Sequence, residues 1–462
     1  MSDPRDPMTT DGSPVAVADQ GGEPDGAETP EPSTAGRRSR ARLLRAARSR
    51  TIIQTVVFFA SNGLVSLLVA ISTAVLARNM STTEFGSYSF AISFLLFSAM
   101  FFDFGIFLPA SRMIATADDE TKPRILAASV IAYVPVGLAY CAAIVGLSFV
   151  VDGAFNVDAG EALRLTAPLA FVYPFALIAQ TIAQGTDRLH VYSITAAVAQ
   201  ILFMALLVGA LVLSSSISVT LALTLRAAGF LAGCIAFVVW LRPRLGGVRA
   251  HVRELMVQAR GYGFEVYVGR LLSVGTYQMD VLMLAALTNA RAVALYSLAG
   301  AVARVVGLPI YGFASALFPK MAREGVLDRR WIMAAWVVGL VGAVVAWALA
   351  KPFIEVVFSE RYTKAATYLL PLALAEVVRA VTTLYNSFLS SQALGRELRN
   401  AGLLLTVSNV VLNLALIPPF GAMGAAIASL IALLVNLAGH IYYYRRHMRQ
   451  PRLGSDPAPS TP

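Results

Sequence analysis

The chain has 462 residues, of which 57% are hydrophobic and only 14% are charged, and its formal net charge is +10. A soluble domain carries about a quarter of charged residues, so this composition excludes an ordinary soluble protein. Apolar runs long enough to cross about 30 Å of hydrocarbon recur along the chain. Because these runs are continuous and do not alternate with polar residues, we expect an all-α polytopic membrane protein.

The amino-terminal segment, residues 1–50, is expected to be a cytoplasmic tail. Residues 1–36 hold eight acidic residues together with many Pro and Gly, which predicts disorder. The following stretch, "RRSRARLLRAARSR" (Arg37–Arg50), holds seven arginines. A nucleic-acid-binding arm has a similar composition. Because the stretch directly precedes an apolar run, we expect it to contact anionic lipid at the cytoplasmic surface and no nucleic acid.

Twelve membrane-spanning helices are expected. They lie near residues 51–77, 85–109, 125–150, 162–183, 190–213, 217–241, 261–287, 292–317, 331–350, 365–391, 400–417 and 423–444. With the amino terminus in the cytoplasm, 27 Lys and Arg residues fall in cytoplasmic segments and 5 in external loops, namely Arg78, Arg291, Lys351, Arg361 and Lys364. This strong bias predicts that both termini are cytoplasmic.

The chain divides into two halves with six expected spans each. These are an N-lobe over residues 51–241 and a C-lobe over 261–444, followed by a basic cytoplasmic tail, 445–462. Shifted by 208 residues, Tyr88 aligns with Tyr296 and Arg112 with Lys320 without a gap. This repeat predicts two lobes that lie around a central cavity and move against each other, as in several transporter families.

The segment between the halves, residues 242–260, is the longest loop. Its apolar residues fall on one helical face, while Arg249, Arg253 and Arg260 lie off that face. The pattern predicts a cytoplasmic linker helix that lies in the membrane interface.

Ionisable side chains within the expected spans are the main functional signal. The stretch "GFEVYVGRLLSVGTYQMDVLMLA" (Gly263–Ala285) carries Glu265, Arg270 and Asp280, and each such group costs about 2.5–3.5 kcal/mol at the centre of a membrane helix. Helical spacing places Glu265 and Asp280 on one polar stripe. Such a stripe cannot face lipid. Similar residues in other spans therefore predict a shared aqueous cavity: Asp103, Arg226, Arg304, Tyr311, Glu376, Arg379 and Asn386.

The residue types indicate what this cavity would bind. Arginine matches phosphate or carboxylate and tyrosine offers a face for sugar rings, so the substrate-binding candidates are Arg226, Arg270, Arg304, Arg379, Tyr262, Tyr277, Tyr311 and Asn386. The candidates for binding a coupling H⁺ or Na⁺ are the acids Glu265, Asp280, Glu376 and Asp103. One alternative stays open, because residues 376 and 379 are spaced to neutralise each other as a structural ion pair.

Several classes of enzyme are disfavoured. The chain has no G-x-x-x-x-G-K-[ST] motif, so we expect no P-loop ATPase. Its external loops are too short for a membrane glycosyltransferase, and no cofactor is expected. The histidines are scattered without metal-ligand spacing, at positions His190, His251, His440 and His447.

Five segments carry a family resemblance. They are "LARNMSTTEFGSYSFAIS" (76–93), "FFDFGIFLPASRMIA" (101–115), "MDVLMLAALTNARAVALYSLAGAVARVVGLPIYGFASALFPKMA" (279–322), "VFSERYTKAATYLLPLAL" (357–374) and "LNLALIPPFGAMGAAIASLIA" (412–432). In this order they resemble the polysaccharide-biosynthesis transporters, such as O-antigen flippases, of the multidrug/oligosaccharidyl-lipid/polysaccharide (MOP) exporter superfamily. The resemblance covers roughly residues 51–444.

The resemblance implies two six-helix lobes around a lumen in the bacterial plasma membrane. It implies ion-coupled flipping of a polyprenyl-phosphate-linked oligosaccharide to the outer leaflet for cell-surface polysaccharide export, with polysaccharide-assembly proteins as further partners. Two alternatives remain open at this point. One is a cation-coupled multidrug or metabolite antiporter of the same superfamily, and the other is a non-transporting scaffold for envelope assembly.

Overall fold

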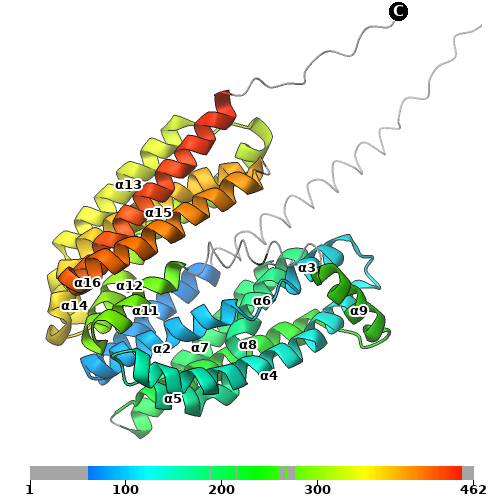
Figure 1. The fold of residues 1–462 in the computed structure, drawn as a ribbon, viewed down its shortest axis with the longest axis horizontal. Coiled ribbons are helices and arrows are strands. Elements are labelled where there is room, and N and C mark those ends of the chain that lie inside the picture. Colours follow the sequence, from blue (N-terminus) through cyan, green and yellow to red (C-terminus); the bar gives the residue numbers. More distant parts are fainter. Residues whose placement is uncertain are drawn as a thin grey trace, which may run out of the picture. The chain divides into compact units, whose positions relative to one another are not determined.

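A computed structural model describes residues 61–186, 189–214, 216–260, 267, 276–392 and 394–449. All regular secondary structure within these ranges is helical (Figure 1). The expected amino-terminal tail, 1–50, residues 450–462 of the expected carboxy-terminal tail, 445–462, and most of the polar stretch 261–275 lie outside the described residues. The described residues all belong to one compact unit of the chain.

The first half contains a helix over Ser61–Asn79 and the segments that follow it. These are α2 (Thr82–Met100), α3 (Phe107–Thr116), α4 (Lys122–Ala154), α5 (Gly160–Thr166), the 3₁₀ turn η1 (Ala167–Leu169), α6 (Val172–Gly185), α7 (Leu189–Leu213) and α8 (Val219–Leu241). Ser81 starts α2 with a capping box, in which its side chain accepts a hydrogen bond from the Glu84 amide and the Glu84 carboxylate accepts one from the Ser81 amide.

After α8, the rest of the chain comprises the expected linker and the second half. Its helices are α9 (Val248–Gln258), α11 (Thr276–Leu287), α12 (Ala290–Glu324), α13 (Arg329–Ala348), α14 (Ala350–Val357), the 3₁₀ turn η3 (Glu360–Ala365), α15 (Ala366–Ser391) and α16 (Gly395–Arg449). Helix α9 lies within the expected linker 242–260, and its place at the membrane surface stays a prediction.

The helices confirm a multi-pass membrane protein. Eight of the described helices are long and apolar enough to cross a membrane, and the bent pair of α5–η1 and α6, with an angle of 52°, makes up to nine. Helix α16 holds two of the expected spans, 400–417 and 423–444. The exact count of twelve spans stays a prediction.

One expected span, 85–109, is interrupted. Helix α2 ends at Met100 and α3 begins at Phe107. Between them, Phe104 and Gly105 have φ angles of 46° and 72°, in the left-handed region that no right-handed helix can contain. The expected membrane position of Asp103 therefore corresponds to this break and not to a helix interior.

Helix α16 reverses direction near its middle. Gly421 has φ 57° and ψ −132°, and two prolines, Pro418 and Pro419, precede it. The Asn436 side chain donates a hydrogen bond of 2.8 Å to the carbonyl of Ala401, 35 residues earlier. The two parts of α16 therefore pack against each other as antiparallel helices, which confirms the break between the last two expected spans.

The two halves meet through α2, α11 and α12. Helix α2 packs against both α11 and α12, and α12 also packs against α15. Gly86 in α2 lies so close to the carbonyl of Ala290 that any side chain there would overlap it. This contact brings the first turns of α2 and α12 together beside the cavity that the next section describes.

Candidate functional site

A cavity of about 280 Å³ lies between helices from both halves of the chain. The first half contributes residues from the helix Ser61–Asn79, α2 and α8, and the second half contributes residues from α11, α12, α15 and α16. Five charged side chains line it, namely Arg226, Asp280, Arg304, Glu376 and Arg379. The cavity therefore combines charged with apolar side chains, and both halves of the chain contribute to its wall.

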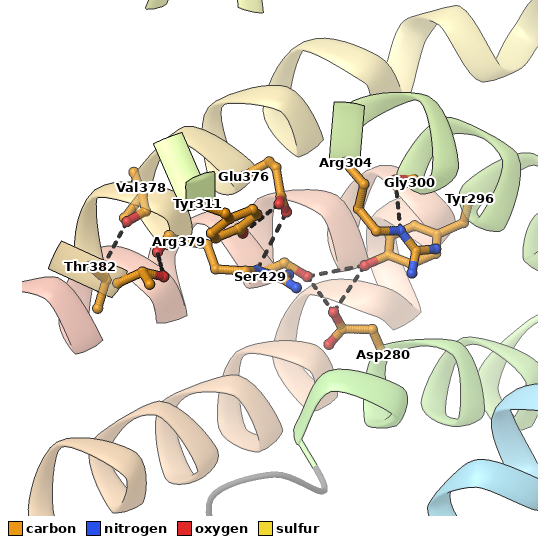
Figure 2. A network of polar contacts seen from close by, with 11 residues as sticks. Asp280, Tyr296, Gly300, Arg304, Tyr311, Glu376, Val378, Arg379, Thr382 and Ser429 are labelled. Carbon is orange, nitrogen blue, oxygen red and sulfur yellow. Dashed lines mark hydrogen bonds and ion pairs between the residues drawn. The ribbon is translucent and has the colours of Figure 1, made fainter. Parts of the chain in front are cut away.

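Asp280 is the centre of a hydrogen-bond cluster on α11 (Figure 2). Its Oδ2 accepts hydrogen bonds from the Tyr296 hydroxyl at 2.9 Å and the Ser429 hydroxyl at 2.6 Å. Its Oδ1 accepts from the side-chain amides of Asn409 and Asn413, both at 2.8 Å. Four neutral donors thus satisfy a carboxylate that is only 9% exposed, as a buried charge requires.

The same cluster contains a buried acceptor with no partner. Asn413 is fully buried, and its Oδ1 has no hydrogen-bond partner among the described residues. Its Nδ2 donates both to Asp280 and to the Asn409 Oδ1 at 3.1 Å. Carboxylate, amide and hydroxyl oxygens together are the ligands that hard cations prefer.

Glu376 on α15 is the second buried acid. Its Oε1 accepts a hydrogen bond of 2.6 Å from the Tyr311 hydroxyl of α12, and its Oε2 lies 3.4 Å from the Nε of Arg379 (Figure 2). The absence of a side chain at Gly307 leaves space for this carboxylate. The expected pairing of positions 376 and 379 is therefore present, although at 3.4 Å it is a loose contact.

Arg304 differs from these paired groups. Its Nε donates a hydrogen bond of 3.3 Å to the carbonyl of Gly300, one helical turn earlier on α12. Within the described ranges, no acidic side chain lies within 4.0 Å of its guanidinium. Its side chain is exposed and lines the cavity, so its positive charge is accessible to a ligand in the cavity.

Arg226 provides a matching charge from the first half. Its Nη1 donates a hydrogen bond of 3.4 Å to the Tyr88 hydroxyl, and its guanidinium lies 5.4 Å and 5.6 Å from the ring centres of Phe203 and Phe230. Its Nε is buried and has no hydrogen-bond partner within the part of the chain described. Aromatic faces stabilise a cation without neutralising it.

The sum of these charges favours an anionic ligand. Three arginines and two acids line the cavity, and only Arg379 forms an ion pair with one of the acids among the residues described. Asp280 is satisfied by neutral donors, so it leaves Arg226 and Arg304 free to bind phosphate or carboxylate oxygens.

The structure brings together five of the expected site residues, the charged set that lines the cavity. Tyr311 contacts the cavity indirectly through Glu376. Two of the expected site residues, Asp103 and Asn386, do not line the cavity. Asp103 lies in the break after α2, and the Asn386 Nδ2 lies 3.4 Å from the His440 Nε2. Outside the described residues are Tyr262, Glu265, Arg270 and the side chain of Tyr277.

Sequence reasoning missed the partners of Asp280. They are Tyr296, Asn409, Asn413 and Ser429, which come from α12 and both parts of α16. The one available signal was the pair of asparagines four residues apart in an apolar span, a spacing that places both amides on one helical face.

The family model described as polysaccharide biosynthesis protein matches residues 53–324 of the chain. No curated protein sequence matches the chain significantly.

Solved structures share the fold. The lipid II flippase MurJ in an inward closed conformation is similar with a TM-score of 0.68 and 13% identity, covering 84% of this chain and 87% of that chain. A multidrug resistance MATE family transporter of the MOP superfamily, in an inward-facing conformation, gives a TM-score of 0.68 and 14% identity over 85% of this chain and 98% of that chain.

A MOP superfamily transporter from Pyrococcus furiosus is similar with a TM-score of 0.55 and 14% identity, over 86% of this chain and 95% of that chain. At such low identity these likenesses establish the fold, while the family match covers more than half of the chain. The resemblance predicted from the five sequence segments is confirmed: the chain belongs to the polysaccharide biosynthesis protein family and has the fold of MOP superfamily transporters.

Proposed function

We propose that this protein flips a lipid-linked oligosaccharide of the polyprenyl-phosphate type from the cytoplasmic to the outer leaflet of the bacterial plasma membrane. One observation carries the proposal: Arg226 and Arg304, from opposite halves, line one cavity without an acidic partner among the described residues. Membership of the polysaccharide biosynthesis protein family supports a glycan substrate. Both termini would lie in the cytoplasm, as the distribution of Lys and Arg predicts.

The phosphate of the substrate would bind between the two arginines. Arg226 on α8 and Arg304 on α12 offer guanidinium groups that can each hold two phosphate oxygens. Tyr88 and Tyr296 line the same cavity and offer ring faces to the first sugar. The polyprenyl chain would stay in the bilayer, where its burial needs no pocket.

The size of the cavity supports an alternating-access cycle. Pockets for drug-sized ligands have volumes of about 300–1,000 Å³, and the described cavity holds about 280 Å³. A phosphate and one sugar would nearly fill it, so a longer oligosaccharide requires the two halves to separate on one side and then on the other.

Contacts between the predicted external loops support closure on the outer side. The Arg78 Nε donates a hydrogen bond of 2.8 Å to the carbonyl of Val357, and its Nη2 donates to the carbonyl of Val356. In the opposite direction, Arg361 donates a hydrogen bond of 3.0 Å to the carbonyl of Met80. These bonds join the two halves, and the outer opening would have to break them.

The Asp280 cluster is our candidate for the coupling ion. With the amides donating to it, as described, the Asp280 carboxylate is satisfied without a cation, while the Asn413 Oδ1 has no hydrogen-bond partner among the described residues. If the amides of Asn409 and Asn413 rotate, their oxygens face the same point as the carboxylate and the Ser429 hydroxyl, a set suited to Na⁺. Protonation of Asp280 would instead remove an acceptor. Either event changes how α11 binds α16, which could bias the two halves towards one conformation.

A cell-based experiment tests the flippase proposal. Depletion of the protein should cause the lipid-linked saccharide to accumulate on the cytoplasmic leaflet, where added glycosidases or lectins cannot reach it in intact cells. Wild-type protein should restore surface polysaccharide, whereas the double variant Arg226→Gln/Arg304→Gln should insert normally and fail to restore it. Normal surface polysaccharide with the double variant would contradict the proposal.

The second candidate is a cation-coupled antiporter of drugs or metabolites, because the MATE transporter and MurJ have the same TM-score and the fold therefore fits both classes equally. It predicts that depletion sensitises cells to small toxic cations while surface polysaccharide is unchanged. Measurement of both properties in one depletion strain distinguishes the two candidates.

A further inference from the structure

Helix α9 packs on the first turns of α4 and leaves a groove beside them. Val248 and Leu255 of α9 are buried, and Val248 packs against the small side chains of Ala127 and Ala128 in α4. The carbonyl of Pro123 accepts a hydrogen bond of 2.9 Å from the Arg244 amide, which holds the chain before α9 against the same end of α4 (Figure 1). The groove between them has a volume of about 930 Å³.

One side of this groove is apolar and exposed. Ile131 and Leu245 line it, with 42% and 73% of their side chains accessible. Ile131 belongs to α4, which is long and apolar enough to span the membrane, and lies nine residues after Lys122, a rise of about 14 Å along the helix. The groove therefore extends from the predicted headgroup level towards the acyl chains.

The other side is cationic. Arg249 and Arg253 line the groove one helical turn apart and are both exposed. Among the residues described, no acidic side chain lies within 4.0 Å of either guanidinium, and the acid of α9, Glu254, lies 3.8 Å from His251. In contrast, the nearby Lys122 and Arg124 are each paired with an acid at 2.9 Å. Two neighbouring guanidinium groups without acids are suited to a phosphate.

We propose that the groove between α4 and α9 binds an anionic glycerophospholipid of the surrounding bilayer. Arg249 and Arg253 hold its phosphate, and one acyl chain covers Ile131 and Leu245. A soluble phosphate would leave these apolar side chains uncovered, and a zwitterionic lipid would add a positive group next to the two arginines. The inference rests on the groove alone and does not depend on the proposed transport activity.

The test uses the full-length protein purified in detergent and freed of lipid. Phosphatidylglycerol is titrated while the melting temperature is recorded, for wild type and for the double variant Arg249→Gln/Arg253→Gln. Each basic residue near an anionic surface contributes about 1 kcal/mol, so the double variant should need about thirtyfold more lipid for the same stabilisation. The matched control is Arg260→Gln, an exposed arginine of the same segment outside the groove, which should behave like wild type.

Three further arms separate the possible ligands. Phosphatidylcholine and inorganic phosphate should each stabilise the wild type far less than phosphatidylglycerol, and polyprenyl phosphate should not compete at equal concentration. Equal stabilisation by phosphatidylcholine, equal stabilisation by inorganic phosphate, preferential binding of polyprenyl phosphate, or an unchanged titration in the double variant would each overturn the proposal. Without lipid, the double variant should have the same melting temperature as the wild type, because both arginines are exposed.

Discussion

The acids of the central cavity and two of its arginines differ in how their charges are satisfied within the protein. Asp280 and Glu376 are nearly buried, and both receive short hydrogen bonds from side chains of other helices. Arg226 and Arg304 line the same cavity, and among the described residues they donate to one tyrosine hydroxyl and one backbone carbonyl, respectively. Among the described residues, the acids of the cavity are therefore satisfied within the protein and two arginines have no acidic partner, which is the pattern expected of the anion-binding cavity that we propose.

The largest expected effect follows from removing the Asp280 carboxylate. Asp280→Ala leaves the buried donors of Tyr296, Ser429, Asn409 and Asn413 without their common acceptor, and unsatisfied buried groups cost about 1–3 kcal/mol each. We expect the free energy of unfolding to fall by at least about 3 kcal/mol, measured as loss of thermal stability in detergent. If stability is unchanged, the cluster does not hold α11 against α12 and α16.

A smaller loss is expected at the second acid. Tyr311→Phe removes the 2.6 Å hydrogen bond to Glu376 and should cost about 2 kcal/mol, because hydrogen bonds to charged groups contribute about 1.5–3 kcal/mol. The matched control is Tyr362→Phe. Tyr362 is buried whereas Tyr311 is half-buried, but the Tyr362 hydroxyl has no hydrogen-bond partner within the described residues, so this variant should keep the stability of the wild type. Equal losses in both variants would show that ring packing, and not the hydrogen bond, matters at position 311.

Two arginine variants test directly whether a paired and an unpaired arginine contribute differently to stability. Arg379→Gln removes the loose ion pair with Glu376, and because the Arg379 side chain is 33% exposed, we expect a loss of only about 1 kcal/mol. Arg304→Gln removes no ion pair within the described part of the chain and should leave the free energy of unfolding unchanged within a few tenths of a kcal/mol. Thermal unfolding of both variants under identical conditions checks the order; a larger loss for Arg304→Gln would mean that its charge is structural.

The weakest expected effect concerns the hydrogen bonds that join the helix Ser61–Asn79 to α14. Arg78→Gln removes the hydrogen bonds to Val356 and Val357, and one net hydrogen bond of about 1 kcal/mol corresponds to a shift of about fivefold towards the outward-open state.

A cysteine introduced at Ser89, which lines the cavity, reports this shift through its rate of modification by an externally added, membrane-impermeant thiol reagent. The background variant Cys141→Ala/Cys234→Ala removes the native thiols, and Arg291→Gln serves as the control, since Arg291 at the start of α12 makes no such contact between the halves among the residues described. An unchanged rate with Arg78→Gln would show that these bonds do not hold the outer side closed.

The sequence was sufficient for the helical membrane architecture and for a charged cavity. Long apolar runs and the cost of burying charge in lipid predicted one shared charged site. Of its expected members, Arg226, Asp280, Arg304, Glu376 and Arg379 line the cavity, whereas Asp103 and Asn386 do not. Both signals are local, since each depends only on residues within one helix.

The sequence did not reveal which of these charges are satisfied. The donors to Asp280 lie 129 to 149 positions later, apart from Tyr296 at 16 positions, so no periodicity within one span could identify them. Likewise, hydrophobicity alone did not reveal the break after Met100, because the left-handed residues Phe104 and Gly105 are as apolar as the helix before them.

The binding of a polyprenyl-phosphate-linked saccharide to the purified protein tests the central role of Arg226 and Arg304 most directly. Affinity would be measured for wild type, for Arg226→Gln/Arg304→Gln and for Arg112→Gln, a surface arginine outside the cavity. We expect the cavity variant to bind at least tenfold more weakly, equivalent to about 1.4 kcal/mol, while the surface variant binds like wild type. Equal affinity in all three proteins would contradict an anion-binding cavity formed by these two arginines.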